Sequence, residues 1–271
     1  NSDHVKKTIQ EKIYRLNLGQ TYATKRILDN TIMIDTEGRK VGQVNGLAIY
    51  HGVDYAFGLP ARITTRVSAG RKGLINVERE SELSGTTHTK GVLIISGFIQ
   101  GKFAREYPLS LSASIVFEQS YGGVDGDSAS STELYVLLSA LSDIPIRQDL
   151  AVTGSVNQFG EIQAIGGVNE KIEGFYRVCS KKGLTGTQGV MIPVANIEDL
   201  QLRDNVIEAV REGKFHIYPI ETIEEGIEHL TGIDAGILMP DGIYPADTIY
   251  GKVDRRLRQM AETLRVFGYR D

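Results

Sequence analysis

The stretch Tyr121-Gly-Gly-Val-Asp-Gly-Asp-Ser-Ala-Ser130 leads into the apolar run from Leu134 to Leu141. Glycine and aspartate dominate its first part, which is typical of a tight polar loop. The run that follows is apolar nearly all round a helical wheel, the pattern of a buried helix. We therefore predict a loop that enters a buried helix, with Ser128 where the two meet.

Ser128 stands where a hydroxyl can be catalytic. The free N–H groups and the positive dipole end of a helix N-terminus suit a developing oxyanion. Serine is also among the preferred N-cap residues, and most serines at helix starts have only that structural role. Position alone leaves both interpretations open.

Lys171 interrupts the apolar side of a second predicted helix, which follows Gly167 and ends at about Lys182. At about 100° per residue, the lysine lies at the centre of a stripe that is otherwise small or apolar, made up of Gly167, Val168, Gly174, Phe175 and Val178. An unpaired ammonium is costly to bury, and burial lowers the pKa of a lysine. A neutral lysine can activate a serine hydroxyl without a histidine. The structural alternative is a lysine that snorkels past the stripe, or one that pairs with Asp125 or Asp127.

Other catalytic and binding motifs are incomplete. Gly97 to Phe103 has the wrong spacing for a nucleotide-phosphate loop and no hydroxyl after its lysine, so we do not expect this chain to hydrolyse ATP. The string Gly126-Asp-Ser-Ala-Ser130 lacks the last glycine of a G-x-S-x-G elbow, which disfavours a Ser-His-Asp hydrolase. The histidines have no metal-ligand spacing, so we expect neither a metal nor a cofactor in this chain; they are His4, His51, His88, His216 and His229.

The segments before the motif alternate between helix and strand patterns. Val5, Ile9, Ile13 and Leu16 recur at helical spacing and form one apolar stripe. Thr31 to Ile34 and Gly42 to Tyr50 flank a turn-forming segment and predict a β-hairpin. Further strands are expected at Ala61 to Val67, Gly73 to Val77 and Leu109 to Phe117, the last with one buried face.

The segments after the motif predict short parallel β-α-β units. Val152 is expected to begin a second hairpin with its turn near Phe159. Strands and helices then alternate, with a strand at 189–192, a helix at 203–211, a strand at 216–218 and a helix at 223–230. A segment rich in glycine, proline and aspartate precedes a last helix, which we interpret as an appendage with an apolar stripe from Val253 to Phe267.

Composition limits the class of protein. With 271 residues, 41% of them hydrophobic, the chain can bury one substantial core. A net charge of -4 offers no basic field for nucleic acid or anionic lipid, and no apolar run reaches the ~20 residues that span a bilayer. The lone Cys179 cannot form an internal disulfide, so we expect a cytoplasmic protein without nucleic-acid or membrane partners. The chain begins at Asn1 without a methionine or a secretion signal, and we expect a piece of something longer.

At the serine and the lysine, the sequence resembles the proteolytic domain of Lon proteases, the ATP-dependent Ser-Lys peptidases. The Gly-Asp-Ser-Ala-Ser form of the serine motif is closer to the B type. The lysine follows the serine by 43 residues, the interval that the family shows. The blocks that carry the resemblance are Tyr121 to Ser130, Val152 to Ser155, Gly160-Glu161, Ile165 to Ile172 and Ile192-Pro193.

The resemblance implies a role for five residues. Ser128 matches the nucleophile of the family and Lys171 its general base. Thr153 matches a threonine whose hydroxyl lies near the lysine, and Asp125 and Asp127 match acidic positions of the B-type motif. The A-type family has proline where this chain has Asp127, so the shape of the active-site loop and the pairing of Lys171 with a carboxylate stay open.

The resemblance also implies an architecture and partners. The expected fold is α+β, of the ribosomal protein S5 domain 2-like kind, assembled as a homo-hexameric ring. Residues 1–30 are expected to be a helical tail from a preceding ATPase part, 31–232 the proteolytic domain and 233–271 a C-terminal helical extension. The implied activity is that of an ATP-dependent serine endopeptidase in protein quality control, which degrades unfolded or damaged proteins. An AAA+ module in the full-length protein would hold ATP and magnesium.

Two rivals accompany this hypothesis. One is a catalytically inactive, Lon-like assembly or scaffold module, in which the stripes at 5–16 and 253–267 bind partners. The other is a peptidase that works without any ATPase. The sequence shows no block that predicts cleavage-site specificity, and it does not predict whether the domain alone is active.

Overall fold

The computed structural model describes residues 2–52 and 55–267. Asn1 and the last four residues, which belong to the predicted tail and extension, lie outside the described residues. The helices are α1 (Ser2–Leu16), α2 (Leu18–Leu28), α3 (Val77–Glu80), α4 (Thr86–Phe103), α5 (Ser130–Ser142), α6 (Val168–Lys182), α7 (Asp204–Arg211), α8 (Ile223–Thr231) and α9 (Ile249–Phe267), with a 3-10 helix at Val194–Asp199. The strands are β1 (Arg39–Lys40), β2 (Gln43–His51), β3 (Ala56–Ala69), β4 (Gly73–Asn76), β5 (Leu111–Phe117), β6 (Ile146–Arg147), β7 (Leu150–Val152), β8 (Ser155–Val156), β9 (Ile162–Gln163), β10 (Gly189–Pro193) and β11 (His216–Ile220).

A mixed sheet of seven strands organises the molecule, in the order β11-β10-β7-β2-β3-β5-β4. The long antiparallel pair of β2 and β3 runs from Gln43 opposite Thr64 to His51 opposite Ala56. Strands β7, β10 and β11 are parallel, joined by the crossover helices α6 and α7, as the predicted β-α-β units require. Strand β5 has strictly alternating burial, which confirms its predicted one-sided packing. The mixed α/β architecture agrees with the expected fold class.

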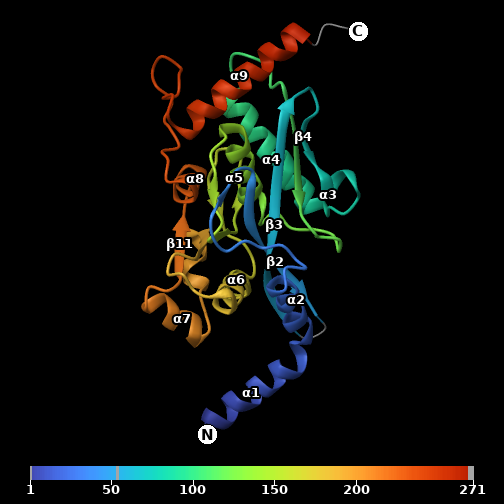
Figure 1. Ribbon diagram of the computed structural model, residues 1–271, viewed down its shortest axis with the longest axis vertical. Helices are drawn as coiled ribbons and strands as arrows, with labels where there is room; N and C mark the ends of the chain where they lie inside the picture. The colour runs from blue at the N-terminus through green and yellow to red at the C-terminus, as the bar shows by residue number, and fades with distance from the viewer. Residues whose placement is uncertain (1, 53–54, 268–271) are drawn as a thin grey trace.

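Helix α5 forms the centre of the main core. Nearly every one of its residues is buried, including Leu134, Tyr135 and Leu138. It packs against β2 and β3 of the sheet and against the helices α4, α8 and α9 (Figure 1). The buried helix predicted after the glycine-rich loop is therefore confirmed.

The two helices with predicted stripes behave differently. In α9, Val253, Leu257 and Met260 are buried in the same core as α5, so this helix is built into the fold and is not an appendage. In α1, Val5 and Ile9 are 59% and 54% exposed. Figure 1 shows α1 extending away from the sheet at the opposite end of the molecule from α9. The proposed boundaries at 30 and 232 stay predictions.

The first predicted hairpin is wrong. Residues 31–34 form no strand. The Gln119 side chain takes the place of a strand partner, because it accepts a hydrogen bond from the Met33 N–H and donates one to the Thr31 carbonyl. Strand β2 pairs instead with β3, and the turn residues before it lead into β1, which pairs with β6. The second hairpin is confirmed as β8 and β9, although Val152 itself ends β7 in the main sheet.

The sequence patterns did not reveal α3 or α4, whereas α2 lies within residues 1–30, which the resemblance implies to be helical. Helix α4 includes the whole Gly97 to Phe103 string, so this segment forms no loop. Val92, Ile95, Phe98 and Ile99 are buried along α4, and glycines interrupt the helical pattern that they form. Within the described ranges, no helix is both long and apolar enough to cross a lipid bilayer.

Candidate active site

The loop from β5 to α5 is held by the segment before α4. The Val124 N–H donates to the Leu83 carbonyl at 2.8 Å, and the Gly85 N–H donates to the Val124 carbonyl at 2.8 Å. Gly126 has a φ of +86°, a left-handed conformation that strongly favours glycine. The predicted tight loop is therefore confirmed, and it reaches Ser128 two residues before α5 begins at Ser130.

The backbone around Ser128 is joined to the chain that follows β7. The Ser128 carbonyl accepts hydrogen bonds from the Gly154 N–H at 2.8 Å and from the Thr153 hydroxyl at 3.2 Å. Ser131 donates through both its N–H and its hydroxyl to the Gly154 carbonyl. These contacts fix the serine segment against the end of the main sheet.

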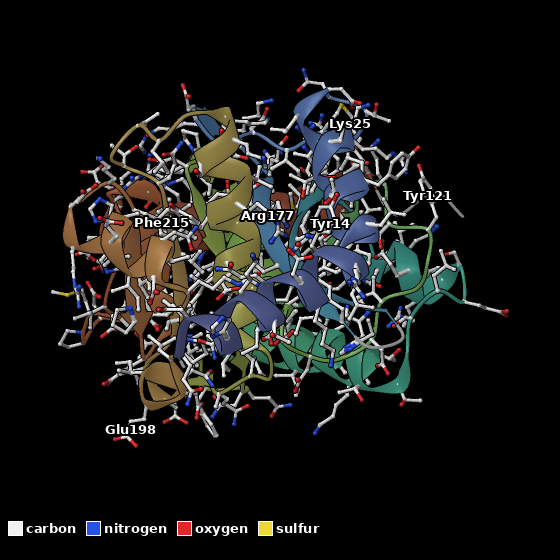
Figure 2. All side chains as sticks on the ribbon, turned by 90° about the horizontal axis from the view of Figure 1, so that it is seen from below. Tyr14, Lys25, Tyr121, Arg177, Glu198 and Phe215 are labelled. Atoms are coloured by element: carbon white, nitrogen blue, oxygen red, sulfur yellow. The ribbon has the colours of Figure 1, made fainter. Side chains whose placement is uncertain are left out.

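Close packing of α6 on β3 brings Lys171 to the serine. A β-carbon on Gly58 would lie 2.0 Å from the Glu170 carbonyl oxygen, and one on Gly174 would lie 2.3 Å from the Gly58 carbonyl oxygen. Any larger residue at either position would push the helix away from the strand. Arg177, on the same helix, donates to the Gly58 carbonyl at 2.7 Å and to the Thr24 hydroxyl oxygen at 3.3 Å, which ties α6 to β3 and α2 (Figure 2).

Lys171 faces hydroxyl groups in a buried setting. Its Nζ lies 2.8 Å from Ser128 Oγ and 3.0 Å from Thr153 Oγ1. The lysine is 2% exposed and Thr153 is fully buried, whereas Ser128 is half-buried and open to a reactant. Burial lowers the pKa of Lys171 to about 8, although the charge of Asp127 opposes this shift. The structure thus brings together three of the five predicted site residues.

The two aspartates have other partners. Asp127 Oδ2 accepts a hydrogen bond from Ser155 Oγ at 3.0 Å, and Asp125 Oδ1 accepts one from the Gly126 N–H at 2.8 Å. Within the part of the chain that the structure describes, neither carboxylate forms an ion pair with Lys171. Asp127 shapes the loop and acts on the lysine through its charge. Asp125 lies against Gly85, where an added β-carbon would meet its carboxyl group at 2.2 Å.

The backbone N–H groups around Ser128 differ in whether they already have an acceptor. The first N–H groups of α5 are already used, because Ser130 donates to the Asp127 carbonyl and Ser131 to the Gly154 carbonyl. Among the hydrogen bonds of the described residues, the N–H groups of Ser128 and Ala129 have no acceptor. These two groups adjoin the Ser128 side chain and remain available as hydrogen-bond donors.

A pocket of about 560 Å³ opens beside the serine loop. Its lining includes the loop at Tyr121 to Asp125, the second half of β2, the facing residues of β3, the end of β5 and one face of α2. Strand β2 pairs with β7 only at Asn45 and Gly46, so its later residues have a neighbouring strand on the β3 side alone. The pocket therefore lies between the free side of β2 and the loop that precedes Ser128.

Ser155 was not identified as a site residue from the sequence. It stands in the Val152 to Ser155 block, but its contact with Asp127 joins residues 28 positions apart. Because no local pattern encodes such a contact, only the fold reveals it.

The chain is similar in sequence to a known protein family. A family model described as the Lon protease (S16) C-terminal proteolytic domain matches residues 119–232, a range that includes the serine and the lysine. The chain is 44% identical over 248 residues to a Lon protease homolog of Haemophilus influenzae, covering 91% of this chain and 41% of that protein. It is 42% identical over 227 residues to a Lon protease homolog of Escherichia coli, covering 83% of this chain and 39% of that protein.

A more distant relative is an archaeal Lon protease of Archaeoglobus fulgidus. It is 33% identical over 228 residues, which cover 83% of this chain and 33% of the relative. The chain therefore spans between a third and two fifths of the length of these three relatives. The two bacterial relatives are named as homologs of Lon, and the archaeal relative as a Lon protease.

Proposed function

The chain belongs to the Lon protease family through its C-terminal proteolytic domain, and from this premise we propose that it is a serine endopeptidase with Ser128 as nucleophile and Lys171 as general base. The observation that carries the proposal is the 2.8 Å contact between Lys171 Nζ and Ser128 Oγ in a buried setting that lacks an ion-paired carboxylate. A scaffold module would have no need to bury a lysine against a serine, since burial of that ammonium is costly.

Acylation follows from this contact. The neutral Lys171 amine removes the hydroxyl proton as Ser128 Oγ attacks the carbonyl carbon of the peptide bond. The negative charge moves to the carbonyl oxygen, where the N–H groups of Ser128 and Ala129 can donate to it. Each well-placed donor of this kind contributes about 3 kcal/mol. When the C–N bond breaks, the Lys171 ammonium returns its proton to the leaving amine.

Deacylation reverses the roles. Water enters where the amine has left, and Lys171 takes one of its protons as the oxygen attacks the acyl carbon of the ester on Ser128. The ester bond breaks, the serine oxygen recovers a proton from the lysine, and the carboxylic acid product leaves. Thr153 accepts a hydrogen bond from Nζ and donates to the Ser128 carbonyl, so it orients the amine through both steps.

The wider setting is also part of the proposal. We infer that the substrates are unfolded or damaged proteins, that an ATPase module of the full-length protein delivers them, and that the domain works in a homo-hexamer. The length of the relatives supports a larger protein, because this chain spans only about two fifths of the two bacterial ones.

The test measures hydrolysis and covalent labelling together. Wild type, Ser128→Ala and the control Ser180→Ala, which changes an exposed serine of α6, are incubated with an unfolded protein and a fluorogenic peptide, with and without ATP. A serine-directed phosphonate is then added, and mass spectrometry locates the adduct. We expect cleavage and an adduct on Ser128 in wild type and Ser180→Ala, and neither in Ser128→Ala.

The outcomes separate the rivals. A wild-type protein that assembles but neither cleaves nor reacts at Ser128 would favour the scaffold module. An adduct on Ser128 without hydrolysis of the unfolded protein would place the missing requirement in the ATPase part. Full hydrolysis without ATP would favour a peptidase that needs no motor.

A further inference from the structure

A second buried polar cluster lies beside the serine segment. His88 Nε2 is 3.3 Å from Glu133 Oε1, which also accepts a hydrogen bond from Asn76 Nδ2 at 3.0 Å. All three residues are fully buried. A buried ion pair of this kind contributes little net stability compared with apolar packing, so its presence calls for another reason.

The pair belongs to the contact between α4 and α5 that also seats the serine segment. A β-carbon on Gly91 of α4 would lie 3.4 Å from Ser130 Cβ and 3.5 Å from Asp127 Cβ. His88 precedes Gly91 by one helical turn, and Glu133 follows Ser130 by one turn. The ion pair is therefore the next layer of the same helix contact.

A hydrogen bond connects the pair to the loop that carries the serine. His88 Nδ1 lies 2.8 Å from Ser84 Oγ, so a protonated imidazole donates to Ser84 with one nitrogen and to Glu133 with the other. Ser84 stands between Leu83 and Gly85, the two residues whose backbones bond both sides of Val124. The histidine thus contacts the helix after Ser128 and the segment that supports the loop before it.

The charges around the histidine favour its protonated form. Glu133 on α5, Glu78 on α3 and Asp125 in the loop all act to raise the pKa of His88 against the effect of burial. Glu133 and Glu78 each have one buried carboxylate oxygen without a hydrogen-bond partner. Burial raises the pKa of Glu133, and the nearby His88 opposes that shift, so the Glu133 carboxylate depends on the imidazolium for its compensating charge.

We propose that His88 and Glu133 are positioning residues, which hold α4 on α5 and, through Ser84, fix the Gly122 to Asp127 loop so that Ser128 meets Lys171. The inference rests on the proposed peptidase function. Neither residue touches the reacting atoms; both act through the backbone that carries them. A misplacement of about 1 Å in a catalytic group can reduce a rate by about a hundredfold, so a small shift of this loop is enough.

Two amide variants of His88 separate its contact with Ser84 from its contact with Glu133. His88→Asn retains a polar group near the Nδ1 position and loses the contact with Glu133. His88→Gln retains a donor near the Nε2 position and keeps the Glu133 contact. Ser84→Ala removes only the link to the loop, at a half-buried position that tolerates a smaller side chain. The matched control is His229→Asn, the same chemical change at an exposed histidine of α8.

The measurement is the rate of phosphonate labelling at Ser128 as a function of pH, together with kcat and KM for peptide hydrolysis and a thermal melt of each variant. We expect His88→Asn to lower the labelling rate and kcat about tenfold with KM little changed, and His88→Gln and Ser84→Ala to lower them about threefold. We also expect the alkaline rise in labelling to shift to higher pH in His88→Asn, because a loosened loop admits water to Lys171. Asp127 is the charged group that acts on that lysine, and it is unchanged in every variant.

If His88→Asn folds and its labelling rate, kcat and pH profile are unchanged, the proposal is overturned. If His88→Asn does not fold, the same unchanged values in Ser84→Ala would overturn it. Normal labelling of Ser128 in wild type and in His229→Asn would show that the proposed function still holds when the positioning role of His88 does not. If wild type is not labelled at Ser128 at all, both proposals fall.

Discussion

Lys171 and His88 are both buried beside the segment that carries Ser128, and burial lowers the pKa of each, yet their net pKa shifts have opposite signs. Lys171 faces the hydroxyls of Ser128 and Thr153, and its pKa falls to about 8. His88 faces the carboxylate of Glu133, and its pKa rises above the ordinary histidine value despite the cost of desolvation. The difference shows that the neighbour, and not burial alone, decides whether a buried base is neutral or charged.

This contrast suits Lys171 and His88 to different roles. A base without a carboxylate partner can exchange a proton at neutral pH, which suits catalysis. A base paired with a carboxylate holds its proton more tightly, which suits a contact between two helices. The predictions below test this contrast with variants that remove Lys171 or His88, with a variant that adds a carboxylate beside Lys171, and with changes of pH.

The largest expected effect follows from removing the lysine. Lys171→Met should fold, because methionine fits the apolar stripe, and should lose about 10²–10⁴-fold in peptide hydrolysis with the loss of a general base. Steady-state kinetics on the fluorogenic peptide measure this effect, with Lys181→Met on the exposed side of α6 as control. Near-normal cleavage by Lys171→Met would contradict the dyad.

A smaller effect should appear in stability, with opposite signs at the two sites. At pH 7 the folded state pays up to about 3 kcal/mol to protonate Lys171, because its folded pKa of about 8 lies below the ordinary 10.5. Lys171→Met removes this cost, although the lost hydrogen bonds offset part of the gain. His88→Leu should instead destabilise by about 3 kcal/mol, since it leaves the Glu133 charge unpaired.

Urea denaturation at several pH values measures both changes. The unfolded state binds more protons than the folded state between the two lysine pKa values, so wild-type stability from this group rises with pH in that window. The advantage of Lys171→Met should therefore shrink as pH increases from about 8 to 10.5. A gain in stability for His88→Leu would invalidate the contrast between the two sites.

The smallest expected effect is the pH dependence of wild-type hydrolysis. Only neutral Lys171 can accept the serine proton, and with its pKa at about 8 the neutral fraction rises about tenfold from pH 7 to 9. Turnover should follow that rise. Thr153→Asp places a carboxylate beside the lysine and should shift the rise to higher pH, while Thr153→Ser should not. A rate that is flat from pH 7 to 9 in wild type would argue against Lys171 as the base.

Much of the fold could be predicted because its elements carry strong local patterns. The all-apolar run of α5, the alternating burial of β5 and the stripe of α6 all match what their sequences indicate. Helix α4 was missed because glycines at 91, 97 and 101 interrupt its pattern, and one of them is needed for close contact with the serine segment. The predicted hairpin at 31–34 is wrong because the Gln119 side chain, 86 residues from Met33, replaces a strand partner.

The stripes of α1 and α9 mark the limit of such predictions. Both have apolar residues at helical spacing, and both form helices. Leu257 and Met260 of α9 are buried in the core, whereas Val5 and Ile9 of α1 are exposed. Periodicity indicates which face of a helix is apolar, but it carries no information about what that face contacts.

By itself, the sequence singled out Ser128 and Lys171 as candidate site residues, and it determined the loop before the buried helix and the placement of the lysine among apolar residues. These depend on residue type and on spacing along one element, which the chain displays directly. The tertiary structure decided that Asp127 bonds Ser155 and not the lysine, that the loop N–H groups are the free donors, and that His88 meets Glu133. These contacts join residues on different elements, and the pKa of each buried group depends on which partners folding brings to it.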